Sequence, residues 1–283
     1  MKILVCIKQV PDSAQIRVHP VTNTIMRQGV PTIVNPYDLF SLEEALRLRD
    51  KFGGEVTVLS MGPPMAAEAL RKCLAIGADR AILLTDRSFA GSDTLATTYA
   101  LAQAIRKVEA EFGPQDIVFT GKQTIDGDTA QVGPGIAKRL NLLQLTYVAK
   151  IESCDAEARE IVVERRSEGG VQVLKTRLPC LITMLEGVND VRRGTIDDSL
   201  RAARAKIVAW SAKDAEIPDL TKCGLKGSPT IVKKVFAPSP RSEKAALVEP
   251  QKTAAESAEA LIGAIFAKQP SLEGDMAKLA GGH

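Results

Sequence analysis

The sequence is poor in histidine and in aromatic residues. Of its 283 residues only His19 and His283 are histidines, so a Ser–His or Cys–His catalytic couple is not expected. Aromatic residues make up 4% of the chain, which argues against a base-stacking surface for nucleic acid. The net charge of +3 comes from 37 basic and 34 acidic residues spread along the chain, without the basic stripe that a nucleic-acid partner requires.

Metal-binding and membrane signals are also missing. The cysteines have no CxxC pair and no nearby histidine, so neither a zinc site nor a disulfide framework is expected. The apolar stretch that follows Met1 ends at Lys8, which is too short for a signal peptide or a membrane span. We therefore expect a cytoplasmic protein without a metal site and without membrane insertion.

Short apolar runs alternate with amphipathic helical periods in the first half of the chain. Continuous apolar runs indicate parallel strands that are covered on both faces. They occur at residues 3–7, 55–59, 80–84, 116–120 and 146–151. Strands alternating with helices predict an α/β fold, a doubly wound parallel sheet. We assume the strand order 3-2-1-4-5 that is usual for sheets binding adenine nucleotides.

Two insertions and a C-terminal arm interrupt this alternation. Residues 19–30 predict a hairpin, and residues 159–166 and 171–178 predict another around the glycine turn Glu168-Gly169-Gly170. The proline-containing stretch 218–250 predicts an extended arm, and residues 254–267 predict a terminal helix. We expect an α/β nucleotide-binding domain over residues 1–217. Residues 218–283 are then an arm whose terminal helix packs on a partner subunit.

The usual phosphate-binding fingerprints are absent. No GxxxxGK[ST] motif occurs, and the loop after the first strand contains no glycine, which excludes GxGxxG at that position. The best candidate is Thr120–Pro134, which follows an apolar strand and leads into a helix. Its glycines allow a ligand to approach the backbone, and helix amides attract phosphate. A plain βα turn, with Asp128 or Thr129 as helix cap, remains the alternative.

The acidic residues of this loop limit its chemistry. Asp126 and Asp128 would repel a phosphate, so we expect them to hold ribose hydroxyls or backbone amides. A calcium loop is excluded because Ala137 stands where that loop requires glutamate. If strands one and four are neighbours, residues 6–12 and 120–134 face each other across one crevice. Helix starts near Asn35-Pro36 and Met61-Gly62-Pro63 lie on the same edge, with Asn35 as a helix cap.

A second polar stretch begins the third helix. Ser92 or Asp93 can cap this helix, as such residues commonly do. Alternatively, the amides and hydroxyls of Thr94 and Thr97 provide a second phosphate contact. The residues themselves favour the cap, because caps of this type are so common.

Several blocks of the first 235 residues resemble the electron-transfer flavoprotein beta subunit. They are Val5–Asp12, Asn35-Pro36, Gly121–Asp128, Gln131-Val132-Gly133 and a stretch from Val163 to Thr183 that carries Arg165, Gln172, Leu174 and Pro179. The resemblance implies a heterodimer with an alpha subunit that holds the electron-transferring flavin. It implies AMP in the beta subunit or, in the bifurcating branch, a second FAD.

The resemblance also implies a set of binding residues. Those matching the family's nucleotide contacts are Cys6, Asn35, Met61 and the loop residues Gly121, Gln123, Asp126, Gly127, Asp128, Thr129, Gln131, Val132, Gly133 and Pro134. Asp93, Thr94 and Thr97 match the bifurcating branch, where these positions hold the pyrophosphate of FAD. Lys8 either stabilises an anionic flavin or phosphate, or merely ends the first strand.

We therefore expect FAD in this subunit, with AMP as the alternative and NADH as a possible hydride donor. The flavin then carries the redox chemistry, and no catalytic side chain is required. A recognition loop for partner dehydrogenases corresponds to Met184–Ile196. Its Asn189-Asp190-Val191-Arg192 has valine in place of the family's proline, which leaves an acyl-CoA dehydrogenase, ferredoxin or flavodoxin open as the redox partner. A regulatory module of the universal-stress type, binding adenine nucleotide without flavin, is the alternative from another class.

Overall fold

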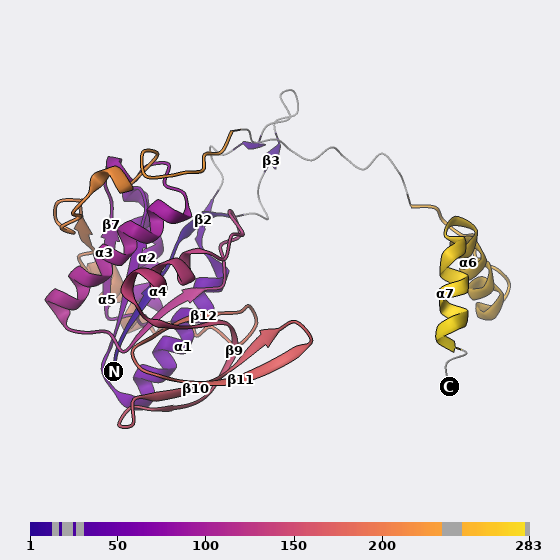
Figure 1. Ribbon diagram of the computed structural model, residues 1–283, viewed down its shortest axis with the longest axis horizontal. Helices are drawn as coiled ribbons and strands as arrows, with labels where there is room; N and C mark the ends of the chain where they lie inside the picture. The colour runs from indigo at the N-terminus through magenta and orange to yellow at the C-terminus, as the bar shows by residue number, and fades with distance from the viewer. Residues whose placement is uncertain (13–16, 19–24, 27–30, 234–244, 281–283) are drawn as a thin grey trace. The chain divides into compact units, whose positions relative to one another are not determined.

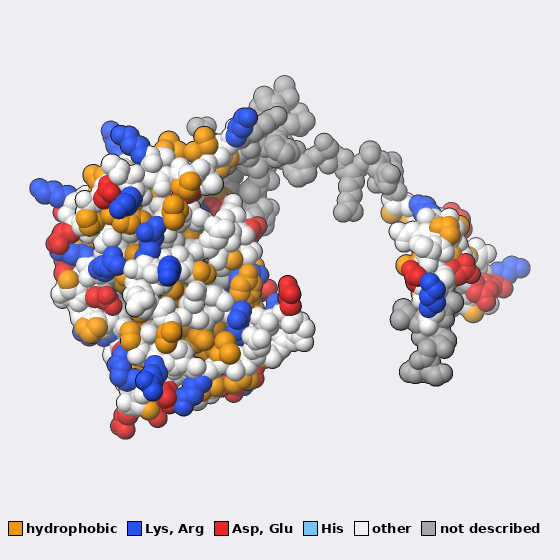
Figure 2. Space-filling view, in the orientation of Figure 1, with side chains coloured by type: hydrophobic (Ala, Val, Ile, Leu, Met, Phe, Trp, Pro, Cys, Tyr) orange, Lys and Arg blue, Asp and Glu red, His pale blue; other side chains and the backbone are white. Residues whose placement is uncertain are grey.

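The fold is described by a computed structural model of residues 1–12, 17–18, 25–26, 31–233 and 245–280 (Figure 1). Contacts divide the chain into a first unit, Met1–Ala237, and a second unit, Pro238–His283. On the face drawn in Figure 2, basic and acidic side chains of the first unit are interspersed.

A nine-stranded sheet forms the centre of the first unit. Its strands are β1 (Lys2–Cys6), β6 (Glu55–Met61), β7 (Arg80–Leu84), β8 (Ile117–Gly121), β9 (Leu143–Asp155), β10 (Glu160–Ser167), β11 (Gly170–Arg177), β12 (Cys180–Met184) and β13 (Val208–Trp210). The order is β11-β10-β9-β12-β8-β1-β6-β7-β13. In this order, every pair of neighbouring strands between β9 and the edge strand β13 is parallel. At the other end of the sheet, β10 is antiparallel to both of its neighbours, β9 and β11.

Helices cover both faces of this sheet. One face is packed by α1 (Pro36–Phe52), α2 (Ala67–Ile76) and α5 (Ile196–Arg204). The other is packed by α3 (Thr94–Phe112) and α4 (Val132–Leu140). Ile3 and Val5 of β1 pack in the α1–α2 cluster, whereas Leu4 and Cys6 pack in the α3–α4 cluster. Both alternating sets of side chains are therefore buried, which explains the continuous apolar run.

The predicted doubly wound α/β fold is confirmed, with one change in strand order. The first four predicted strands lie in the order 3-2-1-4, as assumed. The fifth predicted strand corresponds to β9 and is not next to the fourth, β8. Instead, β12 lies between β8 and β9 and pairs in parallel with both. The chain completes the hairpin β10–β11 before it returns as β12. The predicted glycine hairpin is thus confirmed, but the strand that follows it was missed.

Smaller elements flank the sheet. Two antiparallel pairs are formed by β2 (Gln9–Pro11) with β5 (Thr32–Val34), and by β3 (Arg17–Val18) with β4 (Ile25–Met26). Single-turn helices are η2 (Pro64–Ala66), η3 (Arg87–Phe89) and η4 (Leu220–Lys222). The pair β3–β4 agrees with a hairpin in this region, whereas its predicted turn at 22–24 lies outside the described residues.

The second unit contains two helices. They are α6 (Ala254–Lys268), which confirms the predicted terminal helix, and α7 (Pro270–Ala280), which was not predicted. Thr253 and Glu256 form a capping box at the start of α6, and α6 and α7 contact each other. Leu261, Ile262 and Ile265 of α6 are exposed in this chain. No helix among the described residues combines the length and the apolar character that crossing a membrane requires.

Gly133 allows α4 to lie close to the sheet. A Cβ atom at this position would lie 2.7 Å from Thr120 Oγ1 and 2.7 Å from Thr183 Cγ2. Both threonines belong to central strands, β8 and β12, and both are buried. Neither strand can move aside without disturbing its neighbours. Gly133 therefore has a packing role, whatever its relation to a ligand.

We predict that Gly133→Ala lowers the free energy of unfolding of the first unit by about 1–3 kcal/mol, the usual effect of overpacking. Urea denaturation measures this change. Gly263→Ala in α6 is the matched control, because a Cβ there meets nothing within 4 Å. Alanine favours a helix interior over glycine, so no loss is expected from the control. Equal stability of both variants and the wild type would contradict the packing role.

Candidate functional site

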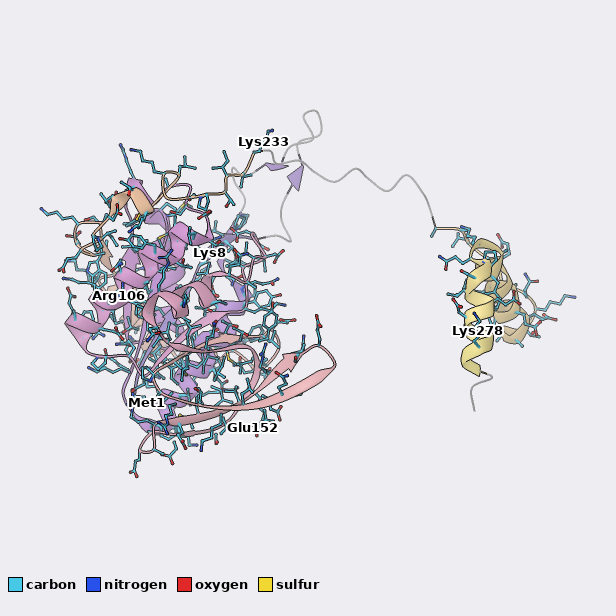
Figure 3. All side chains as sticks on the ribbon, in the orientation of Figure 1. Met1, Lys8, Arg106, Glu152, Lys233 and Lys278 are labelled. Carbon is cyan, nitrogen blue, oxygen red and sulfur yellow. The ribbon has the colours of Figure 1, made fainter. Side chains whose placement is uncertain are left out.

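The loops after β1 and β8 lie together at the carboxyl edge of the sheet. β1 and β8 are parallel neighbours, so residues 7–12 and 121–131 emerge side by side. Lys8 (labelled in Figure 3) donates from Nζ to both carboxylate oxygens of Asp126, at 2.8 and 2.9 Å. The predicted facing of the two loops is confirmed. Lys8 neutralises Asp126 here, which reduces the repulsion that this carboxylate would exert on a phosphate.

Asn35 ties the start of α1 to the second loop. It occupies the N-cap position but makes no side-chain cap hydrogen bond, so its predicted capping role is wrong. Its Nδ2 donates to the carbonyl of Gln123 at 2.9 Å, and its Oδ1 accepts from the amide of Ile125 at 3.2 Å. The side chain is fully buried. Both polar groups of Asn35 therefore bind the backbone of the loop, and neither caps the helix.

Asp38 joins the two loops and was not among the predicted binding residues. Its Oδ2 accepts from the amide of Lys8 at 2.8 Å, and its Oδ1 accepts from the amide of Gly121 at 3.0 Å. Only 4% of the residue is exposed. Its sequence position, an acidic residue in the first turn after Pro36, suggests an ordinary helix-start carboxylate. Only the adjacency of β1 and β8 reveals the other role.

The second loop is ordered by its own side chains. Gln123 donates from Nε2 to Asp128 Oδ1 at 2.8 Å, and Asp128 and Ala130 adopt positive φ angles of 51° and 54°. Helix α4 then begins after Gln131 without a side-chain cap, so the predicted capping by Asp128 or Thr129 is wrong. Instead, Thr129 Oγ1 accepts from the amide of Gln131 at 3.5 Å. The first amides of α4 thus lack side-chain cap acceptors, an arrangement that suits an anion.

Asp93 caps α3, as the simpler interpretation predicted. Its Oδ1 accepts from the amide of Ala96 at 3.0 Å. Its Oδ2 accepts from the hydroxyl and the amide of Thr230, at 2.8 and 3.1 Å. The Asp93 amide donates to Ser228 Oγ at 2.8 Å. The carboxylate is therefore engaged within the protein, and it fastens residues 228–230 to the start of α3.

One hydrogen bond connects the two polar stretches singled out in the sequence. The Thr94 hydroxyl donates to Gln131 Oε1 at 2.8 Å, so the starts of α3 and α4 are adjacent. They line an open pocket of about 400 Å³ together with Pro229 and Thr230. Arg139, which sequence reasoning missed, donates to Thr98 Oγ1 and to the Leu95 carbonyl, both at 3.1 Å. Its place in the last turn of α4 gave no signal of this position.

The remaining predicted residues lie along the same edge. Cys6 ends β1 and is buried, and burial together with the charge of Asp38 raises the pKa of its thiol. It is therefore a protonated core residue rather than a nucleophile. Met61 ends β6 and packs, half-buried, against the α3–α4 cluster. Thr97 lies half-buried in the first turn of α3, where its amide donates to the Asp93 carbonyl at 2.9 Å.

Comparison with known proteins identifies the family. The Electron transfer flavoprotein domain matches residues 22–215. The chain is 73% identical over 283 residues to Protein FixA of Azorhizobium caulinodans, covering 100% of both chains. It is 45% identical over 255 residues to the Electron transfer flavoprotein subunit beta of Clostridium acetobutylicum, covering 90% of this chain and 95% of that one. The chain belongs to the electron transfer flavoprotein family, as a beta subunit. Membership implies an alpha-subunit partner and an association with flavin.

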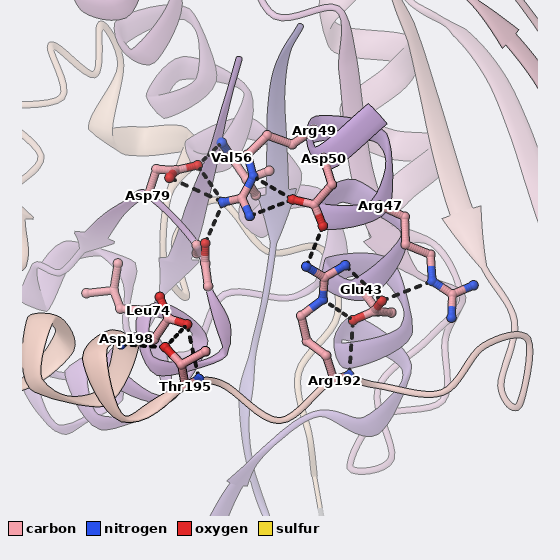
Figure 4. Close-up of polar contacts among 12 residues, drawn as sticks. Glu43, Arg47, Arg49, Asp50, Val56, Leu74, Asp79, Arg192, Thr195 and Asp198 are labelled. Carbon is pink, nitrogen blue, oxygen red and sulfur yellow. Dashed lines mark hydrogen bonds and ion pairs between the residues drawn. The ribbon is translucent and has the colours of Figure 1, made fainter. Parts of the chain in front are cut away.

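In this beta subunit, the stretch expected to form the recognition loop is anchored on α1 (Figure 4). Arg192 donates from Nε, from Nη2 and from its amide to the carboxylate of Glu43, at 2.9, 3.1 and 3.0 Å, and from Nη1 to Asp50 at 2.6 Å. Asn189 Nδ2 donates to the Phe40 carbonyl and to Glu44, both at 3.0 Å. Asn189 and Arg192 therefore attach residues 184–196 to α1, and neither is among the exposed residues of this stretch.

We predict that the ionisation of Asp38 makes stability depend on pH. Burial raises the pKa of Asp38 to about 7 from its ordinary value of 3.8, although the Asn35 side chain and the amides of Lys8 and Gly121 oppose the shift. The stabilising contribution is complete below the ordinary pKa and is lost as the pH rises through the folded one. The stability of the wild type relative to Asp38→Asn should thus fall between about pH 4 and about pH 7 and then level off. Urea denaturation across this range measures it, and a constant or rising difference would contradict the assignment.

We predict that Arg192→Ala costs about 2–3 kcal/mol near neutral pH, because it deprives a buried carboxylate of a charged donor. Burial alone would raise the pKa of Glu43, but the hydrogen bonds from Arg192 and Arg47 outweigh it and hold the pKa below its ordinary 4.5. The cost should be smaller in acid, where Glu43 becomes protonated. Urea denaturation of the wild type and the variant, at neutral pH and in acid, measures this difference. Arg166→Ala, which removes an exposed ion pair with Glu186, should cost about 0.5 kcal/mol or less. An equal loss from Arg192→Ala in acid and at neutral pH would refute this anchoring.

Proposed function

We propose that this beta subunit binds FAD at the carboxyl edge of the sheet, with the dinucleotide held by the loops after β1 and β8 and by the starts of α3 and α4. The observation that carries the proposal is the hydrogen bond from Thr94 to Gln131. It joins the two polar stretches into one site with two adjacent helix N-termini. A pyrophosphate has two anionic groups, which suits two such termini better than a single phosphate does.

The residues present fit this ligand. The uncapped start of α4 and the hydroxyl of Thr97 supply donors, and Arg139 adds a positive charge beside the pocket. Three carboxylates near the site would repel phosphates, and each has a partner within the protein: Asp93 is bound by Thr230, Asp126 by Lys8 and Asp128 by Gln123. We propose that the ribose hydroxyls lie near the Gly121–Asp128 loop, where carbonyls and the Asp128 carboxylate offer acceptors.

When bound, FAD supplies the redox chemistry, accepting a hydride and releasing electrons singly. The chain itself binds and orients the dinucleotide and sets the charge around it. We propose that NADH is the hydride donor and that electrons pass to the alpha-subunit flavin and to a second acceptor such as ferredoxin or flavodoxin, as in electron bifurcation. The exposed residues of the stretch that Arg192 anchors, Ile196 among them, are proposed to contact a redox partner, an acyl-CoA dehydrogenase included. The second unit is proposed to pack on the alpha subunit, which then covers the exposed apolar residues of α6.

A flavin count tests the FAD proposal. We expect two FAD molecules per alpha–beta pair and no AMP when the purified pair is denatured and its nucleotides are separated by chromatography. Thr94→Val should lower the FAD content, because it removes the hydrogen bond to Gln131. Thr221→Val is the matched control, since its hydroxyl bonds Asp219 in η4, outside the pocket lining. One FAD and one AMP per pair would contradict the bifurcating proposal and favour a non-bifurcating electron carrier whose beta subunit binds AMP. A colourless pair that holds only ATP would contradict flavin binding altogether.

A further inference from the structure

Two buried polar residues at the start of α1, Asn35 and Asp38, hold the loop backbones of the proposed site. Asp38 accepts from the amide of Lys8, in the loop after β1, and from the amide of Gly121, the last residue of β8. Asn35 binds the backbone at Gln123 and Ile125, farther along the same loop. The Asn35 amide also donates to the Lys8 carbonyl at 2.9 Å. The start of α1 is therefore a brace against which both loops are set.

The fit around Gly121 leaves no freedom at this brace. A Cβ atom on Gly121 would lie 2.5 Å from Asp38 Oδ1 and 2.6 Å from Tyr37 Cβ. The loop backbone thus lies directly against α1, at a distance that the Asp38 carboxylate sets. A longer or shorter side chain at position 38 would shift Gly121 and, with it, the residues that follow.

We propose that Asp38 is a positioning residue of the nucleotide site, holding the loops after β1 and β8 at the separation that the bound nucleotide requires. The inference rests on the proposed nucleotide-binding function. Asp38 acts on the two loops through their backbone amides, since the carboxylate is buried and each of its oxygens accepts from one of them. The loss of one such hydrogen bond leaves a buried amide unpaired, which is costly in a site that must be preorganised.

The chain contains a matched control at the opposite edge of the same two strands. The Asp116 carboxylate accepts from the amide of Lys2 at 2.9 Å, and its other oxygen accepts from Arg159 at 2.9 Å. Asp116 therefore ties the beginnings of β1 and β8 together, whereas Asp38 ties their ends. Both aspartates support strand pairing, but only Asp38 lies at the loops of the proposed site.

The test uses the full-length chain purified with its alpha subunit, stripped of nucleotide and titrated separately with FAD and with AMP, well below the melting temperature of each variant. Asp38→Asn keeps the size of the side chain and loses one acceptor. Asp38→Glu keeps the charge and adds a methylene. We expect both variants to bind the nucleotide about tenfold or more weakly, the factor that one lost buried hydrogen bond produces. Asp116→Asn should lower the melting temperature but bind like the wild type.

The outcomes separate the two proposals. If the wild type binds a nucleotide and the Asp38 variants bind it equally well while melting earlier, Asp38 is structural only and the positioning role is overturned. If Asp38→Glu binds like the wild type while Asp38→Asn does not, charge and not position is what matters, which also overturns it. If the wild type binds neither nucleotide, the proposed function itself fails. Should Asp38→Asn fail to fold, Asp38→Glu decides the question.

Discussion

The candidate site depends on β1 and β8 lying side by side and parallel at the centre of the sheet. Both strands are buried on both faces, so their positions are fixed by the helices that pack on the two faces of the sheet. Their loops must then leave the sheet at one place. A chain that leaves a buried strand still needs partners for its backbone amides. Asp38 accepts from two of these amides, those of Lys8 and Gly121, on the side of the loops that faces α1. The opposite, outer side of the loops is left for a ligand.

Two of the helices that start at this edge, α1 and α4, lack a side-chain cap, whereas Asp93 caps α3. Asn35 occupies a cap position without capping α1, and α4 begins without a side-chain cap. Each missing cap forgoes about 1 kcal/mol. By contrast, α5 of the first unit and α6 of the second unit carry complete capping boxes. Departures from the local rules that gather at one place are typical of a binding site.

The sequence was informative wherever local pattern and burial agree. Apolar runs located the central strands, and the turn at Gly169-Gly170 located the hairpin. The place of β12 could not be predicted, because it depends on which edge of β8 the chain rejoins after the hairpin. Asp38 was missed for the same reason. A carboxylate in the first turn of a helix looks like a helix-start residue until a neighbouring strand is known to bring Gly121 against it.

The central claim is that the loops after β1 and β8 and the starts of α3 and α4 form one adenine-nucleotide site. Hydrogen–deuterium exchange of the alpha–beta pair, with and without added FAD, tests it most directly. The account predicts slower exchange in peptides covering residues 121–134 and 93–98, because bound phosphates and ribose occupy their exposed amides. Protection confined to other parts of this subunit, with both stretches unchanged by FAD, would contradict it.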